Sequence, residues 1–182
     1  MTSIDRFIQR WRIKEAAAFL EPSDAVLDIG TADGALFTVL PYLKNGIGID
    51  PDAETYELNN ARLIRGLFPQ ALPDDRRFDA ITMLAVLEHI PVDSQKQLAR
   101  DCYNRLRAKG RLIITVPSPR VDDILKLLRA MRLIHGMALE QHYGYEVDMT
   151  PDLFGSAGLR LTTSRKFQLG LNNLFVFEKP AE

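Results

Sequence analysis

The amino-acid sequence predicts an α/β fold in which a mainly parallel β-sheet carries helices on both faces and ends in an antiparallel hairpin. Three observations support this prediction. Apolar residues switch repeatedly between helical and strand spacing, short apolar runs end in glycine or aspartate, and the chain closes with two strands joined by a turn. Its 182 residues, 46% of them hydrophobic, fit one domain spanning residues 1–182.

The first half of the chain alternates between helices and strands. Apolar residues near the N-terminus recur at three- and four-residue spacing, which predicts an amphipathic helix within residues 1–21 that stops before Pro22. A short apolar run then predicts a strand at 25–30 that is buried on both faces. The segments that follow are expected to be a helix at 35–43, a strand at 46–50, a short helix at 53–60, a strand at 61–66 and a loop up to residue 78.

The second half continues the alternation and then changes character. The run FDAITMLAV predicts a strand at 78–86 that enters a turn or short helix. Next we expect a helix at 93–107 ended by Lys109-Gly110, a strand at 111–116, a stiff loop at 116–119, a helix at 121–134 and an irregular segment at 136–149. Thr150-Pro151-Asp152 predicts a capped helix start, and strands at 159–167 and 173–179 form a C-terminal hairpin over 159–179.

Composition narrows the classes of partner and compartment. With a net charge of −1 and a pI near 6.3, the chain has no overall positive charge that would attract nucleic acid or an anionic membrane. The single cysteine, Cys102, excludes an internal disulfide, and its helical context favours a buried structural thiol. No apolar run approaches the ~18 residues of a membrane span, and the N-terminus lacks the apolar core of a secretion signal. We therefore expect a cytoplasmic protein.

The segments VLDIGTADG at 26–34 and GIGIDP at 46–51 carry the strongest chemical signal. Gly30 follows a buried strand, where the chain turns sharply and the backbone can approach a ligand. Asp50 ends the next strand, 20 residues later, where a carboxylate can accept hydrogen bonds from two ribose hydroxyls. The pattern predicts a nucleoside-bearing ligand, although Gly30 and Gly34 also suit ordinary turns and Asp50 also suits a helix cap.

The glycine spacing distinguishes between nucleoside ligands. A dinucleotide fingerprint starting at Gly30 would need glycine at Ala32 and Ala35, and no Gly-Lys-Ser/Thr of a P-loop occurs. Gly30, Ala32 and Gly34 after Asp28 instead resemble motif one of the class I S-adenosylmethionine-dependent methyltransferases, with the middle glycine replaced by alanine. FDAITMLAVLEHIP resembles the fourth motif of small-molecule members of this family, and the segment from Gly110 to Pro119 resembles their fifth strand and its loop.

This resemblance covers residues 28–119 and implies a Rossmann-like, seven-stranded sheet with a cofactor-binding core at 25–119 and a candidate substrate lid at 136–149. By position, Gly30, Thr31 and Gly34 would border the methionine part of S-adenosylmethionine, and Asp50 would hold the ribose. Leu67 stands where relatives often carry an acid that contacts adenine, so backbone or packing would serve there. Leu84 and Ala85 would lie near the sulfonium, while Asp28 would tie down the glycine loop or contact the cofactor directly.

The histidines are the candidates for proton transfer. His142 lies in the lid segment QHYGYE and has an ordinary pKa near neutrality, so it is a candidate base for an acceptor hydroxyl or amine. His89, in the Leu-Glu-His-Ile stretch, is the second candidate. Relatives that hold a metal here carry a further acid at the position of Ala85, so we expect no metal site. His135 ends a predicted helix and suits a structural role.

We therefore predict methyl transfer from S-adenosylmethionine to oxygen or nitrogen of a small-molecule, lipid-linked or sugar-linked acceptor, with S-adenosylhomocysteine as the product. Such a reaction needs mainly alignment, exclusion of water and a deprotonated acceptor. The alternative is a cofactor-binding or assembly module that keeps the fold without turnover, and a nicotinamide oxidoreductase is disfavoured by the glycine spacing. We expect a small-molecule partner, no nucleic acid and no membrane span, and we leave a homodimer open.

Overall fold

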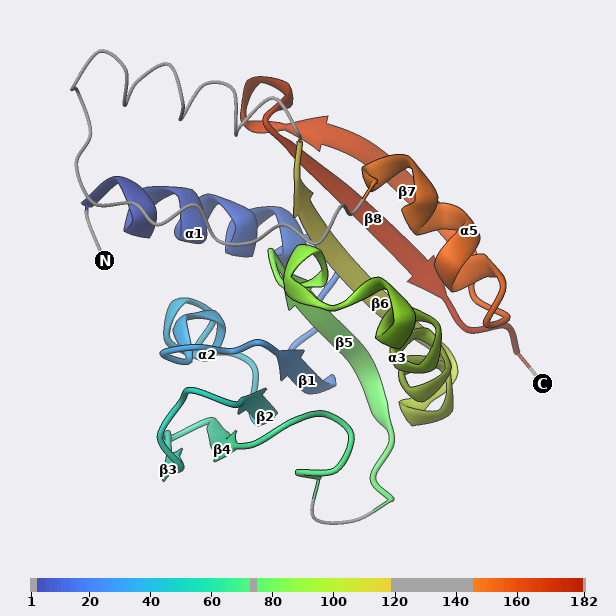
Figure 1. The fold of residues 1–182 in the computed structure, drawn as a ribbon. Helices are drawn as coiled ribbons and strands as arrows, with labels where there is room; N and C mark the ends of the chain where they lie inside the picture. The colour runs from blue at the N-terminus through green and yellow to red at the C-terminus, as the bar shows by residue number, and fades with distance from the viewer. Residues whose placement is uncertain (1–2, 73–74, 119–145, 182) are drawn as a thin grey trace.

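The computed structural model describes residues 3–72, 75–118 and 146–181, and Figure 1 shows their arrangement. In chain order the elements are α1 (Ser3–Ala17), β1 (Ala25–Ile29), α2 (Ala35–Val39), β2 (Asn45–Asp50), β3 (Tyr56–Glu57), β4 (Ala61–Arg65), β5 (Phe78–Leu84), the 3-10 helix η1 (Leu87–His89), α3 (Val92–Arg105), β6 (Leu106–Pro117), η2 (Val147–Met149), α5 (Thr150–Gly155), β7 (Arg160–Phe167), η3 (Gln168–Gly170) and β8 (Asn172–Glu178). The predicted helix at 121–134 and residues 136–145 of the predicted lid lie outside the described residues.

One mixed sheet organises the molecule, with the strand order β3-β4-β2-β1-β5-β6-β8-β7. The strands β4, β2, β1, β5 and β6 run parallel, whereas β3, β8 and β7 each pair antiparallel with a neighbour. The predicted α/β class and its antiparallel ending are confirmed. Because β1 lies between β2 and β5, the strand order reverses at β1, and ligands of such sheets bind beyond the carboxyl ends of the strands there.

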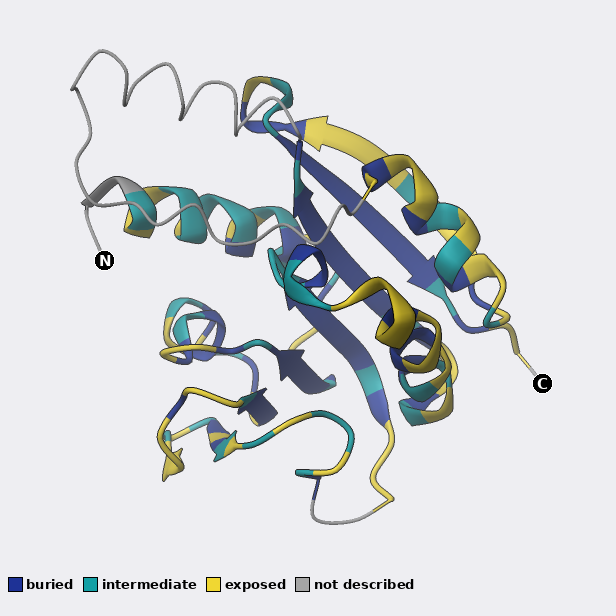
Figure 2. Ribbon diagram, viewed as in Figure 1, coloured by how far each residue is buried: buried dark blue, intermediate teal, exposed yellow. Residues whose placement is uncertain are grey.

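Two apolar layers enclose the sheet. On one face, Leu98 and Cys102 of α3 and Phe154 of α5 pack against the strands, and on the other face Ile13 of α1 and Phe37 of α2 do so. Figure 2 shows the central strands buried while β7 is exposed at the edge. Cys102 is fully buried, and burial raises the pKa of its thiol, which confirms the predicted structural cysteine.

A strand replaces the helix that was predicted at 53–60. Tyr56 and Glu57 form β3, which pairs antiparallel with β4, and the N–H of Leu58 donates to the carbonyl oxygen of Ala61 at 2.7 Å. The two asparagines between them, at 59–60, are turn-forming residues because their side chains compete with helical hydrogen bonding. The turn brings β3 onto β4, so the sheet has eight strands rather than the expected seven.

The fifth long strand begins earlier than predicted. β6 starts at Leu106, so Lys109-Gly110 lies inside a strand instead of ending a helix. The N–H of Lys109 donates to the carbonyl oxygen of Lys179, and the N–H of Lys179 donates to that of Gly110, both at 2.9 Å. These two bonds join segments about 70 residues apart, and local sequence signals do not report such pairing.

Smaller differences concern where helices begin and end. α1 stops at Ala17 and α2 at Val39, earlier than predicted, and α2 ends before Pro41 as proline requires. α5 begins at Thr150, as predicted, but the flanking cap residue is Met149. The Thr150 hydroxyl donates to the Val147 carbonyl oxygen at 2.6 Å, so it stabilises the preceding turn instead of the helix start.

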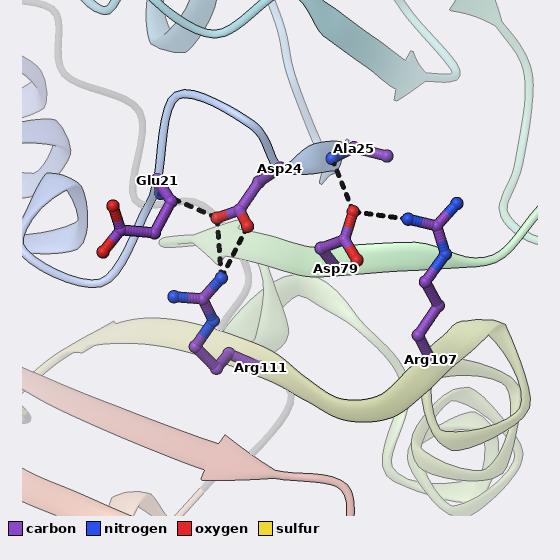
Figure 3. A network of polar contacts seen from close by, with 6 residues as sticks. All are labelled: Glu21, Asp24, Ala25, Asp79, Arg107 and Arg111. Atoms are coloured by element: carbon purple, nitrogen blue, oxygen red, sulfur yellow. Dashed lines mark hydrogen bonds and ion pairs between the residues drawn. The ribbon is translucent and has the colours of Figure 1, made fainter.

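Ion pairs join the strands at the edge opposite the predicted site (Figure 3). Arg111 Nη2 donates to both carboxylate oxygens of Asp24 at 2.7 Å. Asp79 accepts hydrogen bonds from the Ala25 N–H at 2.9 Å and from Arg107 at 2.6 Å. Partial burial works to raise the pKa of Asp79, but these bonds and charges outweigh it and lower that pKa. The network therefore fixes the amino-terminal ends of the strands β1, β5 and β6.

Candidate functional site

A sharp bend follows β1 at the carboxyl edge of the sheet. Gly30 has a φ of 73°, in the left-handed region, and its N–H donates to the Ile49 carbonyl oxygen at 2.8 Å. A Cβ at this position would lie 2.3 Å from Cγ2 of Val86 in the loop after β5. The sharp turn predicted at Gly30 is confirmed, and glycine is also needed there for close packing between the neighbouring loops.

The bend continues through two further left-handed residues. Ala32 has a φ of 47° and Gly34 a φ of 70°. Ala32 occupies the position where the resemblance leads us to expect glycine, and its backbone keeps the conformation that glycine favours. Gly34 leads directly into α2, and the side chain of Thr31, between Gly30 and Ala32, is buried. The loop therefore accommodates alanine in a left-handed conformation at this position.

Asp50, at the end of β2, reaches across to this loop. Its Oδ2 accepts the N–H of Ala32 at 3.0 Å, and its Oδ1 accepts the N–H of Asp52 at 2.8 Å. A carboxylate has about four acceptor positions, so each oxygen keeps one for a further donor. The carboxylate and the glycine bend are thus adjacent, which is the arrangement that a ribose-binding role for Asp50 requires.

The loop after β4 joins the same edge. The N–H of Gly66 donates to the carbonyl oxygen of Asp50 at 3.0 Å, so this loop lies beside the end of β2. The next residue, Leu67, leaves 65% of its surface exposed to solvent. An apolar side chain therefore stands where relatives often carry an acid, and it offers packing surface in place of a hydrogen bond.

Leu84 and Ala85 end β5 on the other side of β1. Leu84 is partly buried, and Ala85 has a φ of 60° with its N–H donating to the Thr115 carbonyl oxygen of β6 at 2.9 Å. The contact of Val86 with Gly30 then closes this loop against the glycine bend. The loops after β1, β2, β4 and β5, each predicted from a separate motif, thus meet at one edge of the sheet.

Asp28 lies beneath the bend, within β1, and only 5% of its surface is exposed. Its Oδ1 accepts the Thr82 hydroxyl at 2.6 Å. Burial raises the pKa of Asp28 to about 6, the Thr82 and Thr31 hydroxyls oppose that rise, and the negative charge of Asp50 adds to it. Asp28 is therefore an acid whose ionisation is costly in the free protein.

Glu88 and His89 follow β5 in η1. The Glu88 carboxylate is buried, and its Oε1 lies 4.0 Å from Nε2 of His89, whose side chain is 36% exposed. Burial lowers the pKa of Arg12 on α1, while the charge of Glu88 raises it, so these two opposite charges lie close enough to interact.

Sequence reasoning missed several polar groups at this edge. Thr82 is detectable in retrospect, because it is a hydroxyl residue within the apolar strand FDAITML. A second set gave no such signal, since its members belong to separate segments: Ser118, Gln168, Asn172 and Asn173, all buried. Asn172 Oδ1 accepts Nε–H of Arg12 at 3.2 Å, and Asn173 Nδ2 donates to Ser118 Oγ at 3.0 Å. These amides join the hairpin to α1 and to the end of β6.

The remaining predictions concern two histidines, metal binding and membrane spans. His142 and His135 lie outside the described residues. In residues 3–72, 75–118 and 146–181, no group of three or more His, Cys, Asp and Glu side chains is arranged to hold a metal ion. Within the same ranges, no helix combines the length and the apolar character needed to cross a membrane.

The structure shows a Rossmann-like sheet whose loops after β1, β2 and β4 meet at its switch point. A family model described as a methyltransferase domain matches residues 3–162, and the chain belongs to that family. It is a class I S-adenosylmethionine-dependent methyltransferase domain, as the motifs predicted.

Individual relatives agree with this assignment. The chain is 30% identical over 121 residues to protein-L-isoaspartate O-methyltransferase of Roseiflexus castenholzii, covering 60% of this chain and 52% of that protein. It spans about half the length of the curated relatives it matches.

Two solved structures share the fold at low sequence identity. A TehB-like S-adenosylmethionine-dependent methyltransferase from Corynebacterium glutamicum superposes with a TM-score of 0.69 at 17% identity, covering 96% of this chain and 97% of that one. Magnesium protoporphyrin IX methyltransferase from Synechocystis PCC 6803, solved with bound S-adenosylhomocysteine, superposes with a TM-score of 0.64 at 14% identity, covering 96% and 82%.

Proposed function

We propose that this chain catalyses transfer of a methyl group from S-adenosylmethionine to oxygen or nitrogen of a small-molecule acceptor, including a lipid-linked or sugar-linked one. When bound, the cofactor supplies a methyl group on a positively charged sulfonium, which is already activated for displacement. The protein then has to bind and orient the two reactants, exclude water and accept a proton from the acceptor. A chain with a net charge of −1 suits a small acceptor better than a polyanion.

The residues at the carboxyl edge fit such a cofactor. The left-handed bend at Gly30 exposes backbone without a side chain at the end of β1, which suits close approach of a ligand. We assign Gly30, Thr31 and Gly34 to the methionine part, with Asp28 beneath them. Exposed Leu67 supplies apolar surface for the adenine. We assign Leu84 and Ala85 to the side of the site that holds the sulfonium.

The observation that carries the proposal is the position of Asp50. Its carboxylate accepts the Ala32 N–H at 3.0 Å, which ties the end of β2 to the glycine loop and leaves acceptor positions for two ribose hydroxyls. A carboxylate that only capped the following turn would need the Asp52 N–H alone. The second bond, to the glycine loop, is the contact that a structural cap does not require.

The acceptor proton needs a base near the sulfonium. We propose His89 for this role, because its partly exposed imidazole lies 4.0 Å from the Glu88 carboxylate and four residues after Ala85. His142 remains the second proposed base. Replacing each histidine separately with asparagine tests the two assignments, and each substitution should leave cofactor affinity unchanged and lower the rate of methyl transfer.

Isothermal titration calorimetry with S-adenosylhomocysteine tests the ribose assignment. Asp50→Ala removes hydrogen bonds to a charged group, and we expect the affinity to fall by about 1.5–3 kcal/mol, which is roughly 10- to 150-fold. Asp52→Ala is the matched control: Asp52 is an exposed acid two residues away whose backbone N–H, retained in alanine, is the group that bonds to Asp50. Its dissociation constant should stay within a factor of two or so of the unsubstituted protein.

Equal affinity in folded Asp50→Ala and unsubstituted protein would remove Asp50 from the site. Turnover is tested by incubating the protein with S-adenosylmethionine and a panel of hydroxyl- and amine-bearing metabolites, with formation of S-adenosylhomocysteine as the readout. Cofactor binding without turnover on any of them would favour the non-catalytic binding module.

A further inference from the structure

Two carboxylates border the glycine loop. Asp50 bonds to the loop from the end of β2, and Asp28 lies beneath it in β1. In the part of the chain that the structure describes, no Lys or Arg side chain forms an ion pair with either of them. Two neighbouring carboxylates without a paired cation give the site a negative charge, which a cationic ligand would balance.

Asp28 is the member of the pair whose charge is costly. It is buried, Thr82 provides a hydroxyl bond at 2.6 Å, and Thr31 lies beside it on the loop. The charged group that faces it across the packed strands is Asp50, which repels a second negative charge. Consistent with this geometry, the pKa of Asp28 is raised to about 6, so in mildly acid solution the free protein carries a proton there.

The two forms of the cofactor differ in one charge at this site. S-adenosylmethionine carries a positive sulfonium, whereas S-adenosylhomocysteine carries a neutral thioether. Their amino-acid groups have the same charges at pH 5–7, because free α-carboxyl and α-amino groups titrate near 3.5 and 8. Asp28 pairs with Thr82, which lies two residues before Leu84 at the proposed sulfonium end of β5. The charge on sulfur is thus the difference between the two ligands to which the buried Asp28 carboxylate would respond.

We propose that Asp28 determines specificity for the charged form of the cofactor: near pH 6 it ionises and releases its proton to solvent when the sulfonium binds, and it regains the protonation of the free protein from solvent when the site holds the thioether product. This inference rests on the proposed cofactor site. The proton balance matches the reaction, in which a hydroxyl or amine acceptor loses one proton as the sulfur loses its positive charge. Product binding is thereby weakened relative to binding of the reactant near neutral pH.

The size of the effect follows from linkage. If Asp28 is half protonated near pH 6 in the free protein and ionised in the sulfonium complex, affinity for S-adenosylmethionine falls about tenfold between pH 7 and pH 5. Affinity for S-adenosylhomocysteine, which brings no charge to the sulfur, changes by less than about twofold over the same range. The ratio of the two dissociation constants therefore shifts about tenfold.

Calorimetric titration of both ligands at pH 5 and pH 7 tests this, with circular dichroism confirming the fold at each pH. Asp28→Asn should abolish the shift in the ratio, because the amide keeps the shape and does not titrate. Asp79→Asn is the matched control, since Asp79 is an acid at the opposite edge that is paired with Arg107, and it should preserve the shift (Figure 3).

A second measurement keeps the proposal testable if Asp28→Asn does not fold. Titration of the unsubstituted protein at pH 6 in two buffers of different ionisation enthalpy should show release of about half a proton with S-adenosylmethionine and close to none with S-adenosylhomocysteine. Equal proton release for the two ligands, or a pH-dependent ratio that survives Asp28→Asn, would overturn the proposal while leaving the cofactor site intact. Failure of both ligands to bind would instead overturn the proposed function.

Discussion

The buried carboxylate of Asp28 should reduce the stability of the free protein at neutral pH. Its pKa is raised from 3.8 to about 6, so the folded state binds this proton more tightly than the unfolded state does. The stability that the protonated form provides is complete below about pH 4 and is lost as the pH rises through about 6. About two pKa units correspond to ~3 kcal/mol, and this is the cost that ionised Asp28 imposes at pH 7.

Asp28→Asn removes that cost, because an amide stays neutral and its oxygen can still accept the Thr82 hydroxyl. We expect the variant to be more stable than the unsubstituted protein by up to ~3 kcal/mol at pH 7, with the difference vanishing near pH 4. Urea unfolding followed by the fluorescence of Trp11, the single tryptophan, measures this between pH 4 and pH 7.5. A variant that is less stable at pH 7, or a difference that does not depend on pH, would refute the reasoning.

Two further predictions concern packing. Gly30→Ala would place a Cβ 2.3 Å from Val86 and force a left-handed alanine, so it should lower the free energy of unfolding by about 1–3 kcal/mol and weaken cofactor binding. Combining it with Val86→Ala should restore part of the lost stability. A thermal scan that shows no destabilisation of Gly30→Ala would contradict this prediction. Cys102 is fully buried with a raised thiol pKa, so a thiol reagent should leave the native protein unmodified for hours at pH 8 and react at once in urea. Rapid labelling of the native protein would contradict the burial of this face of α3 against the sheet.

Much of the fold follows from local chemistry. The alternation of apolar periods predicts the central parallel strands, and the terminal hairpin needs only two strands and the short segment between them. The predicted neighbourhood of Gly30 and Asp50 is confirmed for the same reason. Both residues end buried parallel strands, and parallel strands end at one edge of the sheet.

Other features depend on segments that are far apart in the chain. The early start of β6 is stabilised by Lys179, about 70 residues away, and the eighth strand forms because a turn brings β3 onto β4. The surroundings of the predicted acids were equally hidden: Thr82 binds Asp28, and Arg12 from the first helix interacts with Glu88.

The sequence by itself therefore determined the class of fold, the kind of cofactor and the loops that gather at one edge of the sheet, because these depend on residue types at short spacings. Only the tertiary structure decided which acid is buried, which one bonds to the glycine loop and which charges face each other. Burial and electrostatic coupling arise from contacts between distant segments, so the ionisation of Asp28 beside Asp50 is a property of the assembled sheet.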